Sequence, residues 1–308
     1  MSAPLTTPTP LDWSLVLALG MVWGASFMGV ALALEGFGPL TVAAGRIALG
    51  ALALYAVARA TGHGLPPLRG AGSGRVWAFV CAMALFSNVL PFFLLAWGQQ
   101  HVTSGFAGIT MAAVPLFVIG LAHVFVPGEQ LTPARVAGFV LGLIGVGLLI
   151  GGEVFATTGA ALEDIARIAC VGAAACYAIG SIFTRRAPPI PLVSFSAGAL
   201  LAASVMIVPL ALAIEGIPSL PVDEPIALVG LLYLGLGPTA LATLILVRVI
   251  RSAGPGFLSQ VNYHVPVWSV ILGVTLLGET LPPQFLIALA VILAGLALSR
   301  ASAWRRRP

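Results

Sequence analysis

The sequence predicts an all-α integral membrane protein whose ten transmembrane helices form two inverted repeats of five helices each. Three observations predict this fold class. First, 59% of the 308 residues are hydrophobic and only 8% are charged, whereas about a quarter of the residues of a soluble domain are charged. Second, the apolar residues form ten runs, and most are near the roughly 20 residues that a helix needs to cross a bilayer. Third, short motifs recur in the same order in the two halves of the chain.

The composition also excludes several classes of protein. The mean hydropathy is +1.08, and ten spans leave only short connections, with no room for a separate soluble catalytic domain. Four of the 14 arginines lie in the last nine residues, so the net charge of +4 is no sign of nucleic-acid binding. Cys81, Cys170 and Cys176 lie in apolar runs without CxxC spacing, which argues against a disulfide framework or a metal site. We expect no metal and no cofactor.

Glycine, proline and charge separate the apolar runs of the first half. The first run follows the N-terminal tail (1–12) and ends at EGFGP. It is too long for a signal peptide, so we expect it to stay as a membrane helix. GHGLPPLRGAGSGR separates the second run from the third, and VPGEQLTP separates the fourth from the fifth. The expected helices are 13–34, 39–60, 75–97, 103–126 and 133–151.

The second half is divided in the same way. APPIP precedes its second run, EGIPSLPVDEP precedes its third, and LGETLPP precedes its last. The expected helices are 165–185, 191–214, 225–248, 254–277 and 281–301. A basic tail (302–308) follows the last helix.

The arginines predict the orientation, because cytoplasmic loops of membrane proteins carry an excess of Arg and Lys. With both termini in the cytoplasm, the inner connections hold 12 arginines and the outer connections hold one, Arg167. Arg46 lies inside the second helix. The inner arginines are Arg59, Arg69, Arg75, Arg135, Arg185, Arg186, Arg248, Arg251, Arg300, Arg305, Arg306 and Arg307.

Internal repetition predicts how the halves are related. Val114-Pro115 recurs as Val265-Pro266 and Gly105-Phe106 as Gly256-Phe257, both 151 positions later, and Gly128-Glu129 recurs as Gly278-Glu279. Since each half has an odd number of helices, the second half enters the membrane upside down relative to the first. Inverted repeats are typical of secondary transporters, whose substrate site lies near the midplane between the halves.

The ordered motifs resemble a known family. WGASFMGVALALEG, PLTVAAGRIALGALAL, SGFAGITMAAVPLF and NYHVPVWSVILGVTLLGETL are similar to the EamA-type ten-helix carriers of the drug/metabolite transporter superfamily, which include the YddG amino-acid exporters. The resemblance implies two EamA-like repeats (13–151 and 165–301) and export of small metabolites across a bacterial inner membrane, with the lipid bilayer as the other partner. It also implies a central cavity lined mainly by helices 13–34, 75–97, 103–126, 165–185, 225–248 and 254–277.

Arg46 is the only charge well inside an expected span. A guanidinium there is able to hold a substrate carboxylate in a bidentate pair. The alternative is a structural role, in which the side chain reaches the interface or hydrogen-bonds to backbone carbonyls. Members of the family with different substrates often have an arginine in this helix, which favours the structural role.

Other candidates for substrate binding are polar or aromatic residues that share one helix face. Gln260, Tyr263 and His264 stand at i, i+3 and i+4 just before Pro266, and the imidazole is also able to exchange a proton near neutral pH. Interhelical hydrogen bonding is the structural alternative for this triplet. Trp23, Ser26 and Phe27 form a second face. The repeat adds Tyr177 and Ser181 as its counterparts, although aromatic stripes also serve in helix packing.

Weaker candidates are Asn88, Tyr233 and Thr239, of which Asn88 and Thr239 correspond under the repeat. Pro115 and Pro266 fall inside spans, where proline kinks a helix. We expect them to act as hinges.

The positions of the acidic residues narrow the range of possible substrates. Glu35, Glu129 and Glu279 lie at helix ends, and no Asp or Glu lies in the middle of a span. A buried carboxylate of the kind that exchanges a proton for a cationic drug is therefore lacking. We interpret Glu129 and Glu279 as caps of helix N-termini rather than as gate partners of arginines.

These observations predict a secondary transporter that exports small metabolites by alternating access through a cavity between the repeats. Amino acids, including aromatic and other neutral ones, are the preferred substrates. Other metabolites or lipophilic drugs are the alternative, and a static pore would have a similar sequence. An intramembrane enzyme is remote, because Ser26 in GASF lacks the second glycine of a rhomboid-type GxSG and His264 lies in the other half. We expect no catalytic residues.

Overall fold

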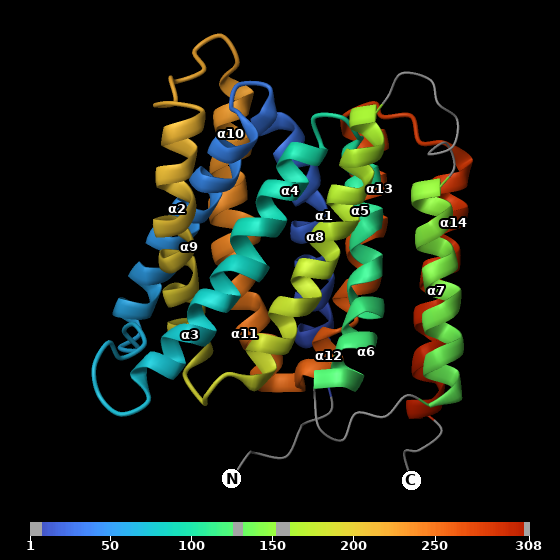
Figure 1. Ribbon diagram of the computed structural model, residues 1–308, viewed down its shortest axis with the longest axis horizontal. Helices are drawn as coiled ribbons and strands as arrows, with labels where there is room; N and C mark the ends of the chain where they lie inside the picture. The colour runs from blue at the N-terminus through green and yellow to red at the C-terminus, as the bar shows by residue number, and fades with distance from the viewer. Residues whose placement is uncertain (1–7, 126–131, 152–160, 305–308) are drawn as a thin grey trace.

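The computed structural model describes residues 8–125, 132–151 and 161–304, in which every regular element is helical. The helices run along one common direction and form a single bundle (Figure 1). Seven helical runs are long and apolar enough to cross a membrane. Three shorter apolar helices, Pro133–Leu149, Val261–Leu276 and Pro283–Ser299, accompany them. The prediction of an all-helical fold is thus confirmed for the described residues, with several helices of membrane-spanning length, while the number of ten spans and their inverted arrangement stay predictions.

The first half has two long unbroken helices, α1 (Pro10–Leu34) and α2 (Pro39–Ala60). The next two rods each contain an irregular turn. The first of them consists of α3 (Ser73–Ala84), the π-helical segment η1 (Leu85–Val89) and α4 (Leu90–Gly98). The second consists of α5 (Ser104–Thr110), the 3-10 turn η2 (Met111–Ala113) and α6 (Val114–Phe125). Helix α7 (Pro133–Gly151) completes this half.

The second half has the same order of elements. It begins with α8 (Ala161–Arg186) and α9 (Leu192–Ile214). A rod with a π-helical segment follows, made of α10 (Pro225–Leu234), η3 (Gly235–Leu241) and α11 (Ala242–Ala253). The last elements are the short α12 (Pro255–Leu258), α13 (Val261–Leu276) and α14 (Pro283–Trp304). All these bounds lie within a few residues of the predicted spans.

Proline sets the start of many of these helices. Helices α1, α2, α7, α10, α12 and α14 begin with proline, whose missing N–H costs nothing in the first turn. At α1 the cap is completed by Thr9 and Asp12: the Thr9 hydroxyl accepts from the Asp12 N–H at 3.2 Å, and the Asp12 carboxylate accepts from the Thr9 N–H at 2.9 Å. This reciprocal pair is a capping box, which satisfies N–H groups that the helix itself cannot.

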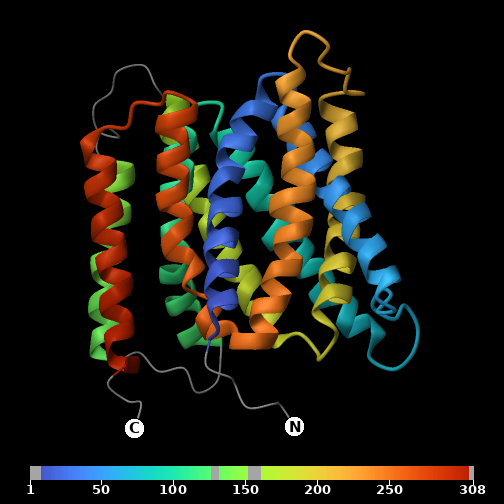
Figure 2. The ribbon, with the colours of Figure 1, turned by 180° about the vertical axis from the view of Figure 1, so that it is seen from behind.

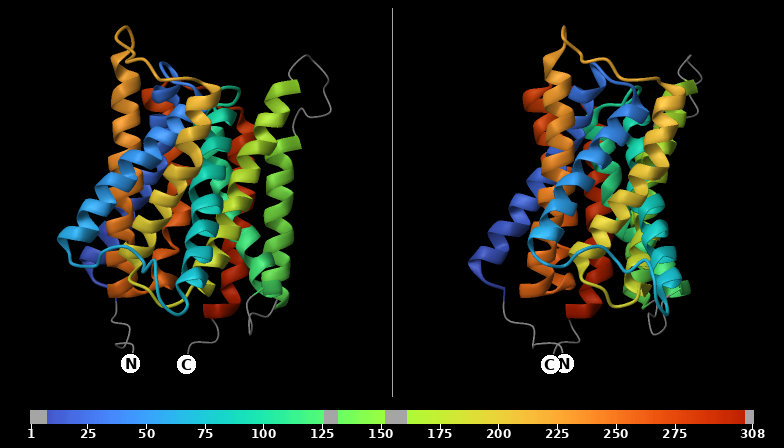
Figure 3. Two further views of the ribbon diagram at one scale, coloured as in Figure 1. Left: turned by 60° about the vertical axis from the view of Figure 1, so that its left-hand side comes forward. Right: turned by 90° about the vertical axis from the view of Figure 1, so that its left-hand side faces the viewer.

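The bundle has two ends, which we call the lower and upper faces as they appear in Figure 1. Helix α1 begins and α14 ends at the lower face (Figures 1 and 2). The connections from α2 to α3 and from α8 to α9 also lie there (Figure 3). The upper face carries the connections from α1 to α2, from α4 to α5 and from α9 to α10 (Figure 1).

Two carboxylates join the halves at the upper face. Glu215, which follows α9, accepts from the N–H groups of Leu40 and Thr41 at 2.9 and 2.8 Å at the start of α2. Glu279, which follows α13, accepts from the N–H groups of Ser104 and Gly105 at 2.7 and 2.9 Å at the start of α5. The interpretation of Glu279 as a cap is thus confirmed, although the helix that it caps belongs to the other half. Glu129 lies outside the described residues.

Small residues let the central helices approach closely. A Cβ atom on Gly24 of α1 would lie 2.5 Å from the Trp268 Cβ of α13, and one on Gly50 of α2 would lie 2.5 Å from the Thr239 Cγ2 of η3. Both contacts join the first half to the second. Helices α7 and α14 form a pair at the edge of the bundle (Figures 1 and 2).

The apolar core has two main clusters. One is built around Phe106, Leu116 and Ile292, and the other around Ile47 and Ile207. Tyr177 and Leu246 pack against both clusters. Both residues also line an interior cavity, which therefore lies at this boundary.

Candidate functional site

A cavity of about 340 Å³ lies in the interior of the bundle, and residues of both halves line it. Its wall has an aromatic part and a polar part. The aromatic part consists of Trp23, Phe27, Phe92 and Tyr177. The polar part consists of Ser26, Arg46, Ser87, Asn88, Ser196, Thr239, Thr243 and Asn262. Since the cavity is largely apolar with a few polar groups, it has the character of a small-molecule site.

Six of the eleven predicted binding residues line this cavity. They are Trp23, Ser26, Phe27, Arg46, Asn88 and Tyr177. The other five, Ser181, Tyr233, Gln260, Tyr263 and His264, are absent from its wall. Residues of α2 and α9 contribute to the cavity in addition to the helices that the family resemblance implies.

Helix α13 presents a different face to the cavity from the predicted one. Asn262 and Val265 line the wall. His264 faces α1 instead, where a Cβ on Gly20 would lie 2.6 Å from the His264 Cβ. Tyr263 packs against the first apolar cluster. Helical spacing alone identified a polar face but left open which neighbour that face meets.

Two other predicted residues use their hydroxyls in hydrogen bonds within the protein. The Tyr233 hydroxyl donates to the Val22 carbonyl at 3.0 Å, which ties α10 to α1 beside Trp23. The Ser181 hydroxyl donates to the Ala178 carbonyl of its own helix at 2.7 Å. In both cases the hydroxyl is occupied by a backbone carbonyl, as is usual for polar groups in apolar surroundings.

Arg46 is the charged group of the site. It is only 6% exposed, and its Nε donates to the Thr239 hydroxyl at 3.0 Å. The guanidinium carbon lies 3.7 Å from the centroid of the Phe92 ring, so the cation stacks on that aromatic face. No carboxylate within the described ranges forms an ion pair with Arg46. A buried cation without a counter-charge is costly and is a default candidate for function.

The local structure of η3 explains how the Thr239 hydroxyl is positioned to accept a hydrogen bond from Arg46. Pro238 has no N–H, so the helix lacks one donor for the carbonyls of the preceding turn. The Thr239 hydroxyl donates to the Leu234 carbonyl at 2.8 Å and accepts from Arg46. The Pro238 carbonyl accepts from the Trp23 indole N–H at 3.1 Å. One π-helical segment therefore positions both the cation and an aromatic wall of the cavity.

The other π-helical segment, η1, carries Asn88. Its side-chain amide donates to the Met83 carbonyl at 3.3 Å, and its residue is 8% exposed. Such segments are often found at functional sites. The sequence comparison of the two halves had already paired Asn88 with Thr239, which is the one signal that pointed to Thr239. Phe92, Ser196 and Asn262 were not predicted: Phe92 and its neighbour Phe93 belong to an apolar run, Ser196 lies two residues after Ser194, and Asn262 lies between Gln260 and Tyr263 but off the face that was chosen.

The two predicted hinge prolines lie near irregular turns. Pro115 follows the 3-10 turn η2 within the first turn of α6. Pro266 lies inside α13, which begins after the break that separates it from α12. Their role as hinges stays a prediction.

The chemistry of the cavity suits an organic anion with an apolar body. The guanidinium offers a planar fork of donors that matches a carboxylate, and hydroxyl and amide oxygens on the wall are able to accept hydrogen bonds. Among the described residues that line the wall there is no Asp or Glu. Among the residues that the structure describes, no group of His, Cys, Asp and Glu has the arrangement of a metal site.

Several known proteins are similar to this chain over most of its length. A model described as the EamA-like transporter family matches residues 13–151 and again residues 165–301. The inner membrane transporter YedA of Escherichia coli K12, itself uncharacterized, is 29% identical over 92% of this chain and 88% of that protein. A probable terminal-alkyne amino-acid exporter of Streptantibioticus cattleyicolor is 27% identical over 96% of this chain and 95% of that protein.

A solved protein structure supports the fold. One crystal structure superposes with a TM-score of 0.67 over 96% of this chain and 99% of that chain, at 24% sequence identity. At this identity the likeness concerns the fold alone.

Proposed function

The chain belongs to the EamA-like transporter family, and we propose that it is a secondary transporter that exports amino acids through the cavity between its two halves. Membership in the family and the names of the relatives indicate a membrane transporter.

The uncompensated guanidinium of Arg46 carries the proposal. It lies on the cavity wall, and its only described polar contact is the one from Nε to Thr239. An amino-acid carboxylate would supply the missing negative charge in a bidentate pair. The ammonium group would find acceptors in the amide and hydroxyl oxygens of the wall and in the face of Trp23. The aromatic wall also suits the side chains of aromatic and other neutral amino acids.

Corresponding features of the two halves support ten spans in two inverted repeats (13–151 and 165–301). The rods α3–α4 and α10–α11 each contain a π-helical segment, and both segments contribute to the cavity. The next rod of each half is interrupted, by η2 in the first half and between α12 and α13 in the second. Inverted repeats with discontinuous helices around a central site are the architecture of many secondary transporters.

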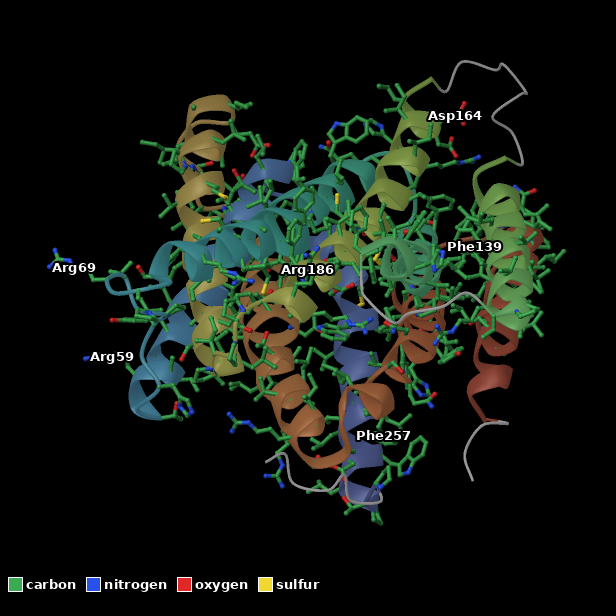
Figure 4. All side chains as sticks on the ribbon, turned by 60° about the horizontal axis from the view of Figure 1, so that its bottom comes forward. Arg59, Arg69, Phe139, Asp164, Arg186 and Phe257 are labelled. Carbon is green, nitrogen blue, oxygen red and sulfur yellow. The ribbon has the colours of Figure 1, made fainter. Side chains whose placement is uncertain are left out.

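The arginines of the sequence predict that both termini lie in the cytoplasm. The grouping of arginines at one face of the bundle supports this orientation in an inner membrane. Arg59, Arg69, Arg185, Arg186 and Arg251 belong to segments at the lower face (Figures 1 and 4), and an excess of arginine favours the cytoplasmic side. The lower face would then be cytoplasmic, and Glu215 and Glu279 would close the outer side. Alternating access would require these caps to separate during the cycle, with Pro115 and Pro266 as the hinges.

The alternative substrates are other metabolites or lipophilic drugs, which the aromatic wall would also accommodate. Cationic drugs are disfavoured because the charge of Arg46 would repel them and no carboxylate lines the cavity. A substrate with a carboxylate would pair with the charge of Arg46 and also contact the aromatic wall, whereas a neutral substrate would leave that charge unpaired.

Efflux from proteoliposomes tests the proposal. Vesicles would be loaded with the twenty amino acids, and the protein-dependent loss of each would be measured by mass spectrometry with and without a proton gradient. We expect selective loss of a few amino acids, and a much smaller loss for Arg46→Gln than for the matched surface variant Arg59→Gln. No protein-dependent loss of any amino acid would contradict this substrate and leave the family membership intact.

A further inference from the structure

A second hollow, of about 460 Å³, lies at the lower end of the bundle between α2, α9 and α11. The lower parts of α2 and α11 are visible in Figure 2. The apolar lining residues, which we call its apolar side, are Val57, Val193, Leu244 and Val247. The polar lining residues are Thr61, His63, Arg248, Arg251 and Ser252, and on α2 and α11 they lie about one turn closer to the lower end than the apolar ones. The hollow is thus amphipathic, and it is separate from the central cavity, with which it shares no lining residue.

The two cations come from the last turns of α11. Arg248 and Arg251 are three residues apart, so they lie on one face of the helix. Both are exposed. Cations are favoured at a helix C-terminus, where the free carbonyls carry partial negative charge. Within residues 8–125, 132–151 and 161–304, neither arginine forms an ion pair or a side-chain hydrogen bond.

The polar rim is held in place by the end of α2. The N–H of Gly62 donates to the Arg59 carbonyl at 3.2 Å and the N–H of His63 to the Ala58 carbonyl at 2.9 Å. This pattern, with Gly62 at φ 73°, is a Schellman cap, which favours glycine at that position. The His63 ring nitrogen Nδ1 lies 3.0 Å from the Thr61 hydroxyl. The chain therefore turns back and keeps both side chains beside the hollow.

One acidic residue, Asp12, lies beside the site and is already held by other partners. Asp12 interacts electrostatically with Arg248, but its carboxylate already accepts from the N–H and the hydroxyl of Thr9 at 2.9 and 2.7 Å and from the hydroxyl of Ser252. Asp12 is thus engaged in capping α1. The donors of Arg248 and Arg251 stay available to an anion from outside the chain.

We propose that this hollow binds an anionic phospholipid, with its phosphate on Arg248 and Arg251 and its acyl chain on the apolar side. Basic pockets between membrane helices recognise such headgroups, and arginine pairs with phosphate through its planar fork. The apolar side distinguishes the site from a site for a free anion. Val57, Leu244 and Val247 are able to contact an acyl chain, whereas a small anion would make no use of them.

Native mass spectrometry of the purified full-length protein tests the proposal. Phosphatidylglycerol or phosphatidylcholine would be titrated into the protein, and the bound fraction would be compared between Arg248→Gln/Arg251→Gln and the control Arg59→Gln/Arg69→Gln. The control removes the same charge from the same face, where both side chains extend away from the bundle (Figure 4). At about 1 kcal/mol per basic residue, the pocket variant should bind phosphatidylglycerol about 30-fold more weakly. Equal binding by the two double variants would overturn the proposal.

Two further measurements identify the ligand. Leu244→Trp fills the apolar side while keeping both arginines, and we expect it to weaken phosphatidylglycerol binding as well. Inorganic phosphate at millimolar concentration would be tested as a competitor. If phosphate displaces the lipid fully and Leu244→Trp binds normally, the site takes a free anion and the lipid assignment is wrong. None of these outcomes depends on which substrate the central cavity transports.

Discussion

The Nε of Arg46 donates a hydrogen bond to the Thr239 hydroxyl at 3.0 Å, across a sequence separation of 193 residues. The two residues belong to different halves, so this bond joins the halves at the wall of the central cavity. The terminal nitrogens of Arg46 make no hydrogen bond to any residue in the described part of the chain. One edge of the guanidinium is therefore fixed, and its fork is available for a substrate.

Arg46→Lys should weaken binding of carboxylate substrates by about tenfold or more, because an ammonium cannot form the bidentate pair. An amino acid and its amide, measured in the same counterflow assay, separate two roles of this residue. If Arg46 binds the carboxylate, transport of the amide should fall much less than transport of the acid. Equal losses together with a lower melting temperature would indicate a purely structural role.

Thr239→Val removes one hydroxyl that serves two partners, the Leu234 carbonyl and Arg46. We expect the variant to lose about 1–3 kcal/mol of stability because buried polar groups lose their partners, and to transport poorly. Thr239→Ser should restore both properties. Thr275→Val is the matched control, since the Thr275 hydroxyl donates only to a carbonyl of its own helix at an exposed position. Thermal unfolding in detergent provides the comparison, and similar melting of the two valine variants would refute the role of Thr239.

Glu279→Gln should destabilise the upper face by about 1 kcal/mol, because an amide is a weaker cap than a carboxylate at a helix N-terminus. Glu215→Gln should have a similar effect at α2. Glu35→Gln, an exposed position without a side-chain hydrogen bond in the described residues, is the control. Protease accessibility of the upper connections would show whether either variant opens this face. Unchanged melting and accessibility would mean that the caps do not hold it closed.

Trp23→Ala and Tyr263→Ala distinguish the cavity wall from the surrounding core. Trp23 lines the cavity and donates to the Pro238 carbonyl, whereas Tyr263 packs outside it. We expect the first variant to impair transport at normal membrane insertion, and the second to lower stability more than transport. A strong loss of transport in a well-folded Tyr263→Ala variant would mean that Tyr263 takes part in substrate binding, as its spacing from Gln260 and His264 predicted.

The sequence by itself determined the class of the fold and the course of the helices. Apolar runs bounded by proline and glycine predicted the helix bounds to within a few residues, because a bilayer permits few other ways to satisfy the backbone. Arg46 and Asn88 were predicted to line the cavity because an apolar span makes a polar side chain conspicuous, and both do line it.

Only the tertiary structure decided which face of each helix meets the cavity. Gln260, Tyr263 and His264 share one face of α13, but close contact at Gly20 and Gly24 turns His264 toward α1 and leaves Asn262 on the cavity wall. The π-helical segments η1 and η3 change the helical register, which a fixed period cannot anticipate. Thr239 became part of the site because α2 and η3 approach closely at Gly50, and Phe92 because its ring from α4 lies against the Arg46 guanidinium. Such contacts depend on side-chain volumes from distant parts of the chain, and helical spacing along one segment contains no information about them.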